Sequence, residues 1–236
     1  MRTSLRRWSI SLLLGLTAAL IAFSSTARAQ CPTPSNLPAL SITVTVAQPS
    51  ITYHHDVDLF GLPKLEHHSE RPPAGSVLLG LTKLSDHWSM GTRGAAVKLP
   101  DGRICFWLTR IDALLGDPTM NVYVAAEYAP DTCEYKTILD HENTHVRFNL
   151  ETLRDWMPTV KAALTEAARR KFPAIFPGPP TNEDLRYYLA DNMQTVFDLM
   201  GDDLRQRNAT IDTPENYRRT SALCHNWSRH GWKMDQ

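Results

Sequence analysis

Residues 134–156 read EYKTILDHENTHVRFNLETLRDW, and the pattern of the chain changes at this stretch. Its apolar residues recur every three to four positions, which is the period of an amphipathic helix. Upstream, from 41 to 128, apolar and polar residues alternate as they do in strands. Downstream, to about 226, the helical period persists. Strands followed by helices predict an α+β fold, with an N-terminal, mostly antiparallel sheet and then a helical half.

Glycine, proline and aspartate mark turns in both halves, and these turns set the expected ends of the strands and helices. In the first half we expect strands at 41–46, 51–57, 76–81, 95–99, 103–111 and 121–128. Asp101-Gly102 lies between two of them and is a hairpin signal. In the second half Pro158 is expected to stop or restart the helix, because proline is tolerated only in a first helical turn. Beyond it we expect helix at 159–171, a proline-rich connection at 172–180, and helices at 181–207 and 214–226.

The helix that begins near residue 134 carries the motif His141-Glu142-Asn143-Thr144-His145, an H-E-x-x-H sequence. Residues four apart lie on one side of a helix, so the two imidazoles can bind one metal ion together. Neutral imidazole is a good Zn²⁺ ligand, and zinc held by three protein ligands keeps a position for water. Glu142 lies where it can take a proton from that water. His141 and His145 are therefore predicted metal ligands, and Glu142 a predicted catalytic base.

This motif is specific. The chain contains nine histidines, and chance predicts roughly 0.01 such motifs in a chain of this composition. The alternative is a pair of surface histidines, but the motif shares its helix face with Ile138 and Asn149, so we expect partial burial. Two other pairs are weaker: His54-His55 points to opposite faces of a strand, and His67-His68 lies in a polar loop.

The sequence resembles the zincin clan of metallopeptidases. Over residues 133–146 it also resembles uncharacterised secreted bacterial proteins that are presumed to be zinc peptidases. The resemblance implies that His141 and His145 bind zinc and that Glu142 is the general base. It also implies that a substrate peptide adds to an edge strand beside the active-site helix. The segment 121–128, just before that helix, is the expected edge strand.

The sequence leaves the identity of the third zinc ligand undecided. The metzincin pattern would use Glu151, but this chain lacks the glycine turn of that pattern, so Glu151 stays on the helix about 120° from His145. The gluzincin pattern places a Glu on a later helix, which points to Glu166, although a chain reversal after 157 leaves it about 7 Å short. Asp203 is the acid nearest the apolar face of helix 181–207. His225 is a further candidate. Tyr187 and Tyr188 are candidates to stabilise an oxyanion.

The N-terminal segment 1–29 predicts export. Three arginines precede an apolar stretch at 8–23, and Ala27-Arg28-Ala29 forms a cleavage site of the A-x-A type. The apolar stretch is shorter than the roughly 20 residues that span a bilayer. Cleavage removes four arginines from a chain with 25 basic and 25 acidic residues, so the mature protein is mildly acidic. This charge excludes a strongly basic nucleic-acid-binding protein, and no membrane insertion is expected after cleavage.

All four cysteines lie in the exported part, where disulfides persist. No C-x-x-C is present, which argues against redox catalysis. Of the three possible pairings we prefer Cys105–Cys133, which flank a predicted hairpin, together with Cys31–Cys224, which would join the two ends.

The sequence thus predicts a periplasmic or secreted protein with one zincin-like domain at 30–236. Its strand-rich part is 41–128 and its helical part 134–226. The predicted function is zinc-dependent hydrolysis of a peptide or protein. One alternative is a non-catalytic envelope protein with a structural or degenerate metal site, which would be closed by a fourth protein ligand. Another is a periplasmic metal carrier that uses several of the histidines.

Overall fold

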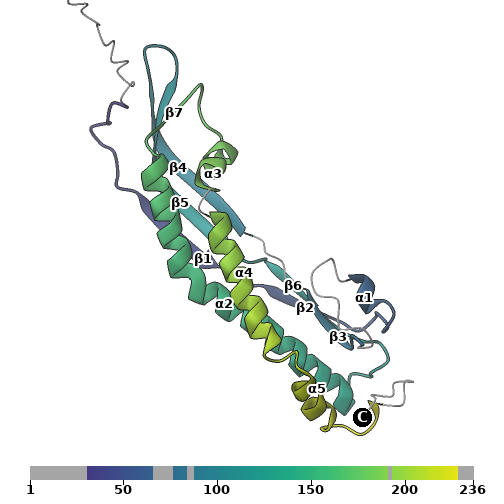
Figure 1. The fold of residues 1–236 in the computed structure, drawn as a ribbon. Helices are drawn as coiled ribbons and strands as arrows, with labels where there is room; N and C mark the ends of the chain where they lie inside the picture. The colour runs from purple at the N-terminus through teal and green to yellow at the C-terminus, as the bar shows by residue number, and fades with distance from the viewer. Residues whose placement is uncertain (1–30, 66–76, 84–87, 191–192, 228–236) are drawn as a thin grey trace, which may run out of the picture. The chain divides into compact units, whose positions relative to one another are not determined.

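The computed structural model describes residues 31–65, 77–83, 88–190 and 193–227. The predicted signal peptide at 1–29 lies outside the described residues, and so does His67-His68. Seven strands within the described ranges form two mixed sheets (Figure 1). The first sheet contains β1 (Ser41–Val46), β4 (Trp88–Lys98), β5 (Ile104–Leu115) and β7 (Ala174–Phe176). The second contains β2 (Ser50–His54), β3 (Gly80–Lys83) and β6 (Thr119–Val124).

Strand β5 organises the first sheet. It pairs with β1 in parallel and with β4 and β7 antiparallel. The β4–β5 connection is the hairpin predicted from Asp101-Gly102: Leu99 donates to the carbonyl of Arg103 at 2.8 Å, and Gly102 adopts a φ of 89°, which glycine tolerates best. The hairpin prediction is therefore confirmed.

The part of the chain that the structure describes also contains five helices: α1 (Leu62–Leu65), α2 (Cys133–Lys171), α3 (Asn182–Ala190), α4 (Met193–Ala209) and α5 (Pro214–Ser221). The α+β prediction is confirmed. The expected helix at 181–207 is described as two helices, α3 and α4, on either side of residues 191–192, which are not described. The connection 172–180 contributes the short strand β7, and the last helix ends at Ser221 rather than near 226.

Helix α2 begins where the Thr132 side chain accepts a hydrogen bond from the amide of Tyr135. It then runs through Pro158 to Lys171, so the prediction that Pro158 stops or restarts the helix is wrong. Proline leaves one backbone carbonyl without its helical partner. Burial of Leu153 and Val160 on either side of it offsets this loss, because both residues are less than a tenth exposed.

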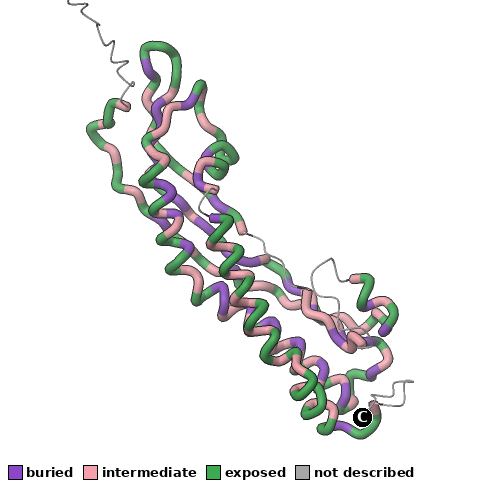
Figure 2. Tube along the Cα trace, viewed as in Figure 1, coloured by how far each residue is buried: buried purple, intermediate pink, exposed green. Residues whose placement is uncertain are grey.

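The two halves of α2 pack against different sheets. Ile138 belongs to a core with Val124 and Tyr128, whereas Leu164 belongs to the core of the first sheet. In Figure 2 the buried positions recur along α2. The buried residues Glu142, His145, Asn149 and Thr152 lie on the face that the sequence predicted to be covered. The H-E-x-x-H motif therefore lies in the half of α2 that packs on the second sheet.

The expected edge strand is wrong. Within the described second sheet, β6 is the central strand, parallel to β2 and antiparallel to β3. The chain leaves β2, returns as β3, and pairs Gly80–Lys83 with residues 121–124 of β6. An alternating pattern shows which residues form a strand but not which neighbours the strand receives. The strand that lies at the edge and contacts the motif is β3.

The disulfide prediction is also wrong, because the bonds are Cys31–Cys105 and Cys133–Cys224. Cys105 is buried in β5 and faces the segment before β1, whereas Cys133 starts α2 and faces the chain just after α5. The Cα atoms are 5.6 Å and 5.8 Å apart, within the usual range for disulfides. Two disulfides are typical of a protein from an oxidising, extracytoplasmic compartment. None of the described helices is long and apolar enough to cross a membrane.

Candidate metal site

His141 and His145 lie one turn apart on α2, as the motif predicted, and their rings meet. Their Nε2 atoms are 3.1 Å apart, and the rings stand nearly perpendicular, at 82°. The side chains are only 14% and 11% exposed. Two imidazole nitrogens held this close on a largely covered helix face could bind one metal ion together.

Asp212 supplies the third group. It lies in the turn between α4 and α5, where its amide donates to the carbonyl of Asn208 and where Thr213 caps α5. Its Oδ1 atom lies 3.1 Å from Nε2 of His141 and 3.5 Å from Nε2 of His145. Among the described residues, His141, His145 and Asp212 form a group of three side chains that could hold one metal ion.

The spacing of the three atoms fits a zinc-sized ion. Neighbouring ligands of a tetrahedral ion at about 2.0–2.1 Å are separated by about 3.3 Å, and the three separations here are 3.1, 3.1 and 3.5 Å. Two imidazoles and a carboxylate are also a ligand set that Zn²⁺ uses in proteins. The residues present therefore fit a metal ion, whose identity the geometry leaves open.

Neighbouring side chains hold these groups in position. His145 donates from Nδ1 to Oδ1 of Asn208 at 2.9 Å, which directs Nε2 toward the site. The Tyr217 hydroxyl donates to Oδ1 of Asp212 at 2.7 Å, and the Tyr217 ring lies against His141. Asn208 lies in the last turn of α4 and Tyr217 lies on α5, so three helices contribute to this group of side chains.

The electrostatics of the site favour a cation. Burial opposes charge on His145, but hydrogen bonding to Asp212 and the charge of Glu142 outweigh it and raise the pKa of His145 to about 9. Burial would raise the pKa of Asp212, but hydrogen bonds from the two histidines hold it well below its usual range. Burial, then the bond to Asp212, raises the pKa of the Tyr217 phenol, which therefore stays protonated. Negative groups thus surround the place where the imidazoles converge.

Glu142 is buried beside the histidines, with 5% of its surface exposed. The Thr82 hydroxyl on β3 lies 2.8 Å from Oε2 of Glu142 and 3.0 Å from its main-chain oxygen, and donates to these atoms. Gly80, two residues earlier, approaches so closely that a Cβ atom there would lie 2.6 Å from Oε1 of Glu142. Burial raises the pKa of Glu142 and makes its carboxylate a stronger base.

None of the four predicted third ligands belongs to this group. Asp203 instead accepts from the Trp156 indole at 2.8 Å and from Arg207. Glu151, Glu166 and His225 are not part of the described cluster of ligand atoms. The four candidates that the sequence left open therefore lie outside the described group of ligand atoms.

Asp212 follows His141 by 71 positions and lies in a turn between two helices, so no helical spacing links the two residues. Its sequence signal was its place immediately before Thr213-Pro214, a helix start. Of the tyrosines considered for oxyanion stabilisation, Tyr187 is exposed and Tyr188 packs against Phe176. Tyr217 is the phenol that lies at the site.

A pocket of about 360 Å³ adjoins His141 between α2 and α5. Its lining is mostly polar and includes Asp140, Thr144, Arg147, Asn216 and Leu223.

Comparison of the chain with protein-family models found no match, and searches of curated proteins and of solved structures found nothing significantly similar. The resemblance to the zincin clan therefore rests on the motif, on its position in a helix, and on the group that surrounds it.

Proposed function

We propose that this protein is an exported zinc-dependent hydrolase that cleaves peptide bonds. The observation that carries the proposal is the convergence of Asp212 on the two histidines of the motif, with Glu142 buried beside them. Three protein ligands are the number used by catalytic zinc sites, which keep a further position for water or substrate. The disulfides and the N-terminal sequence support export.

In this mechanism a bound Zn²⁺ would supply Lewis acidity and lower the pKa of a coordinated water to about 7. Glu142 accepts the proton of the attacking water and passes it to the departing amine. Thr82 orients the Glu142 carboxylate through its hydrogen bond. Asn208 fixes the tautomer of His145, with Nδ1 protonated. Tyr217 keeps its proton and donates it to Oδ1 of Asp212, which holds that carboxylate toward the two histidines.

The burial of both imidazoles favours a second candidate, a structural metal site. Such a site would tie the α4–α5 turn to α2, because Asp212 belongs to that turn and the histidines belong to the helix. Structural zinc is closed by four protein ligands, and only three are described here. A structural metal would stabilise the fold without any role for Glu142 as a base.

Glu142→Gln separates the two candidates. The glutamine keeps the size of the side chain but cannot act as a base. We expect the purified protein to bind one zinc ion, as measured by mass spectrometry of the metal, and to cleave a mixed peptide library. We expect Glu142→Gln to keep the zinc and to lose peptide cleavage by roughly 10²–10⁴-fold.

Glu151→Gln is the matched control, because it makes the same change on the same helix outside the ligand cluster, and it should leave cleavage unchanged. Cleavage that survives Glu142→Gln with zinc bound would contradict the mechanism. Zinc binding without cleavage of any peptide by the unmodified protein would favour the structural site. A protein that binds no zinc at all would refute both.

A further inference from the structure

The polar pocket between α2 and α5 shares a wall with the candidate metal site. His141, one of the three candidate ligands, lines this pocket, and so does Ile211, the residue before Asp212. On α2 the lining continues through Thr144 and Arg147. These residues follow His141 at intervals of three positions, so they lie on one side of the helix. The pocket therefore extends from the metal group along α2.

Arg147 brings a positive charge to this pocket that no described side chain neutralises. It is the only lysine or arginine among the described residues that line the pocket. Its guanidinium carbon lies 5.2 Å from the centroid of the Phe148 ring, and its guanidinium forms no hydrogen bond or ion pair with another described side chain. A guanidinium carries five N–H donors in a planar fork that matches a carboxylate. In Arg147 these donors are unused.

Asp140 lines the same pocket but does not cancel the charge of Arg147. The two residues are exposed and lie seven positions apart on α2, which is about 10 Å along the helix axis. Exposed charges at that separation are largely screened at physiological ionic strength. The pocket is thus acidic at one end and basic at the other, and a carboxylate is attracted to the end at Arg147.

We infer that Arg147 determines the specificity of this protein by binding a carboxylate of the substrate. The inference rests on the proposed function, because it assigns the substrate of that same site. Arg147 lies six residues after His141, about 9 Å along α2, and an extended peptide advances about 3.3 Å per residue. The carboxylate therefore lies about three residues from the bond that is cleaved. It belongs either to an Asp or Glu side chain or to the C-terminus of a short peptide.

Cleavage of the mixed peptide library, with the fragments identified by mass spectrometry, tests this preference. We expect a carboxylate to be enriched about three residues to one side of the cleaved bond. Two peptides distinguish its sources: one has an internal Glu and an amidated C-terminus, and the other has a free C-terminus and no acidic side chain. Each is compared with an uncharged counterpart, in which Gln or an amide replaces the carboxylate.

Arg147→Glu tests the contact itself. We expect it to lower kcat/KM for the preferred peptide by about fivefold or more and to remove the advantage of that peptide over its uncharged counterpart. Arg154→Glu is the matched control, because it makes the same change of charge at an exposed position of α2 outside the pocket lining, and it should keep the preference. Equal cleavage of charged and uncharged peptides by the unmodified protein, or an unchanged preference in Arg147→Glu, would overturn the inference and leave the proposed function intact.

Binding without cleavage keeps the two proposals separable. Fluorescence anisotropy with labelled peptides on Glu142→Gln should show about fivefold tighter binding of the charged peptide than of its uncharged counterpart. Adding Arg147→Glu should abolish this difference. If the unmodified protein cleaves no peptide, the proposed function fails, and the difference in binding still decides the inference. Equal affinities, or no binding of either peptide, would overturn it.

Discussion

At the scale of single residues, the close approach of β3 to α2 depends on Gly80. Strand glycines usually weaken a sheet, but here the absence of a side chain lets the backbone of β3 pass directly over Glu142. The same approach brings the Thr82 hydroxyl within hydrogen-bonding distance of the carboxylate. One small residue thus permits both the burial of Glu142 and its orientation.

Gly80→Ala should therefore displace Glu142 or β3. Its Cβ atom would lie 2.6 Å from Oε1 of Glu142 and 2.7 Å from Cγ2 of Ile138, closer than van der Waals contact allows. We expect a loss of about 1–3 kcal/mol in the free energy of unfolding, measured by urea titration, and a fall in peptide cleavage. Gly91→Ala is the control, since a Cβ there meets nothing within 4 Å. Equal stability of the two variants would contradict the close packing.

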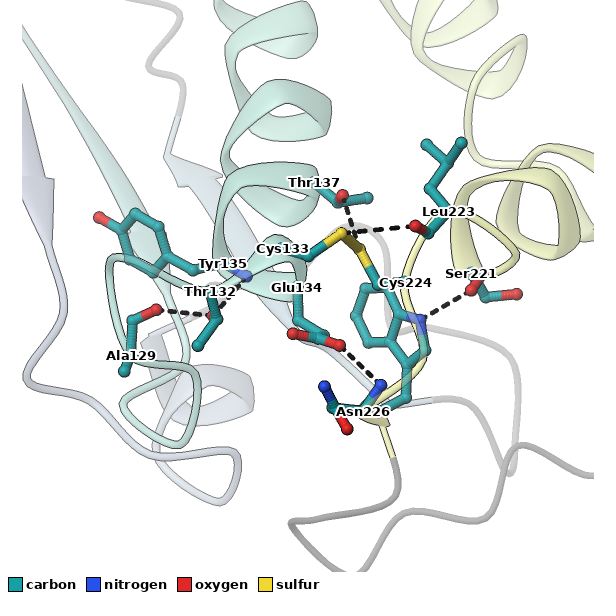
Figure 3. Close-up of a disulfide and its surroundings, with 11 residues drawn as sticks. Ala129, Thr132, Cys133, Glu134, Tyr135, Thr137, Ser221, Leu223, Cys224 and Asn226 are labelled. Atoms are coloured by element: carbon teal, nitrogen blue, oxygen red, sulfur yellow. Dashed lines mark hydrogen bonds between the residues drawn. A yellow bond between two sulfur atoms is a disulfide. The ribbon is translucent and has the colours of Figure 1, made fainter.

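At the scale of elements, the segment that carries Asp212 is tied to α2 by a disulfide. Figure 3 shows the Cys133–Cys224 bond between the first turn of α2 and the chain after α5. The tie is reinforced where Glu134 accepts from the amide of Asn226 at 2.8 Å. The segment that carries Asp212 is therefore anchored at both ends, because α4 precedes it and this disulfide follows it beyond α5.

Replacing both Cys133 and Cys224 by serine should weaken zinc binding as well as stability. The loss of the cross-link is expected to cost about 2–4 kcal/mol, and the freed segment holds Asp212 less firmly, so zinc affinity should fall at least tenfold in a competition titration. Replacing Cys31 and Cys105 is the matched control. That bond joins the segment before β1 to β5, so its loss should lower stability but leave zinc affinity within threefold. Equal zinc affinity in the two variants would refute the tethering role.

The contact between α2 and α4 predicts a pH dependence. The Arg207 guanidinium and the Trp156 indole hold the pKa of Asp203 below its ordinary value. An acid whose pKa is lowered in the folded state stabilises the fold at pH values above its unfolded-state pKa, which is about 3.9 for Asp. This stabilisation is lost as the pH falls through the folded-state pKa. Asp203→Asn should therefore lower the free energy of unfolding by about 0.5–1 kcal/mol at pH 7, since the carboxylate is partly exposed. The difference in free energy of unfolding between the unmodified protein and Asp203→Asn should become smaller below about pH 4, as measured by parallel urea titrations. A difference in free energy of unfolding that stays constant from pH 7 to pH 3 would contradict the stabilising role of the Asp203 carboxylate.

At the scale of the whole molecule, a metal ion would join elements that are far apart in the chain. Free zinc at 100 times its dissociation constant should stabilise the fold by about 2.7 kcal/mol. For a chain of this size that corresponds to a rise in Tm of roughly 5–10 °C. Calorimetry with zinc and with a chelator should show the difference, and Asp212→Asn should remove most of it. Asp203→Asn, an acid outside the site, should keep it. A Tm that does not respond to zinc would exclude the site.

Local patterns predicted much of the fold. The period of two gave six of the seven described strands, at least in part, and missed β7. Asp101-Gly102 gave the hairpin turn, and the period of 3.6 gave α2 with its buried face. The patterns failed where packing overrides local preference, as at Pro158, where the helix continues and buries Leu153 and Val160 on either side. They also failed at β6, since the position of a strand in a sheet depends on which segments return to pair with it.

The sequence alone brought the two histidines together, because residues four apart on a helix meet whatever the rest of the chain does. Only the tertiary structure decided the third group and the disulfide partners. Asp212 reaches the site across 71 positions because α4 packs along α2 and the following turn reverses the chain. Cys224 meets Cys133 through the same reversal. Contacts at that separation depend on how helices and sheets pack together, and no period or spacing in the sequence records that packing.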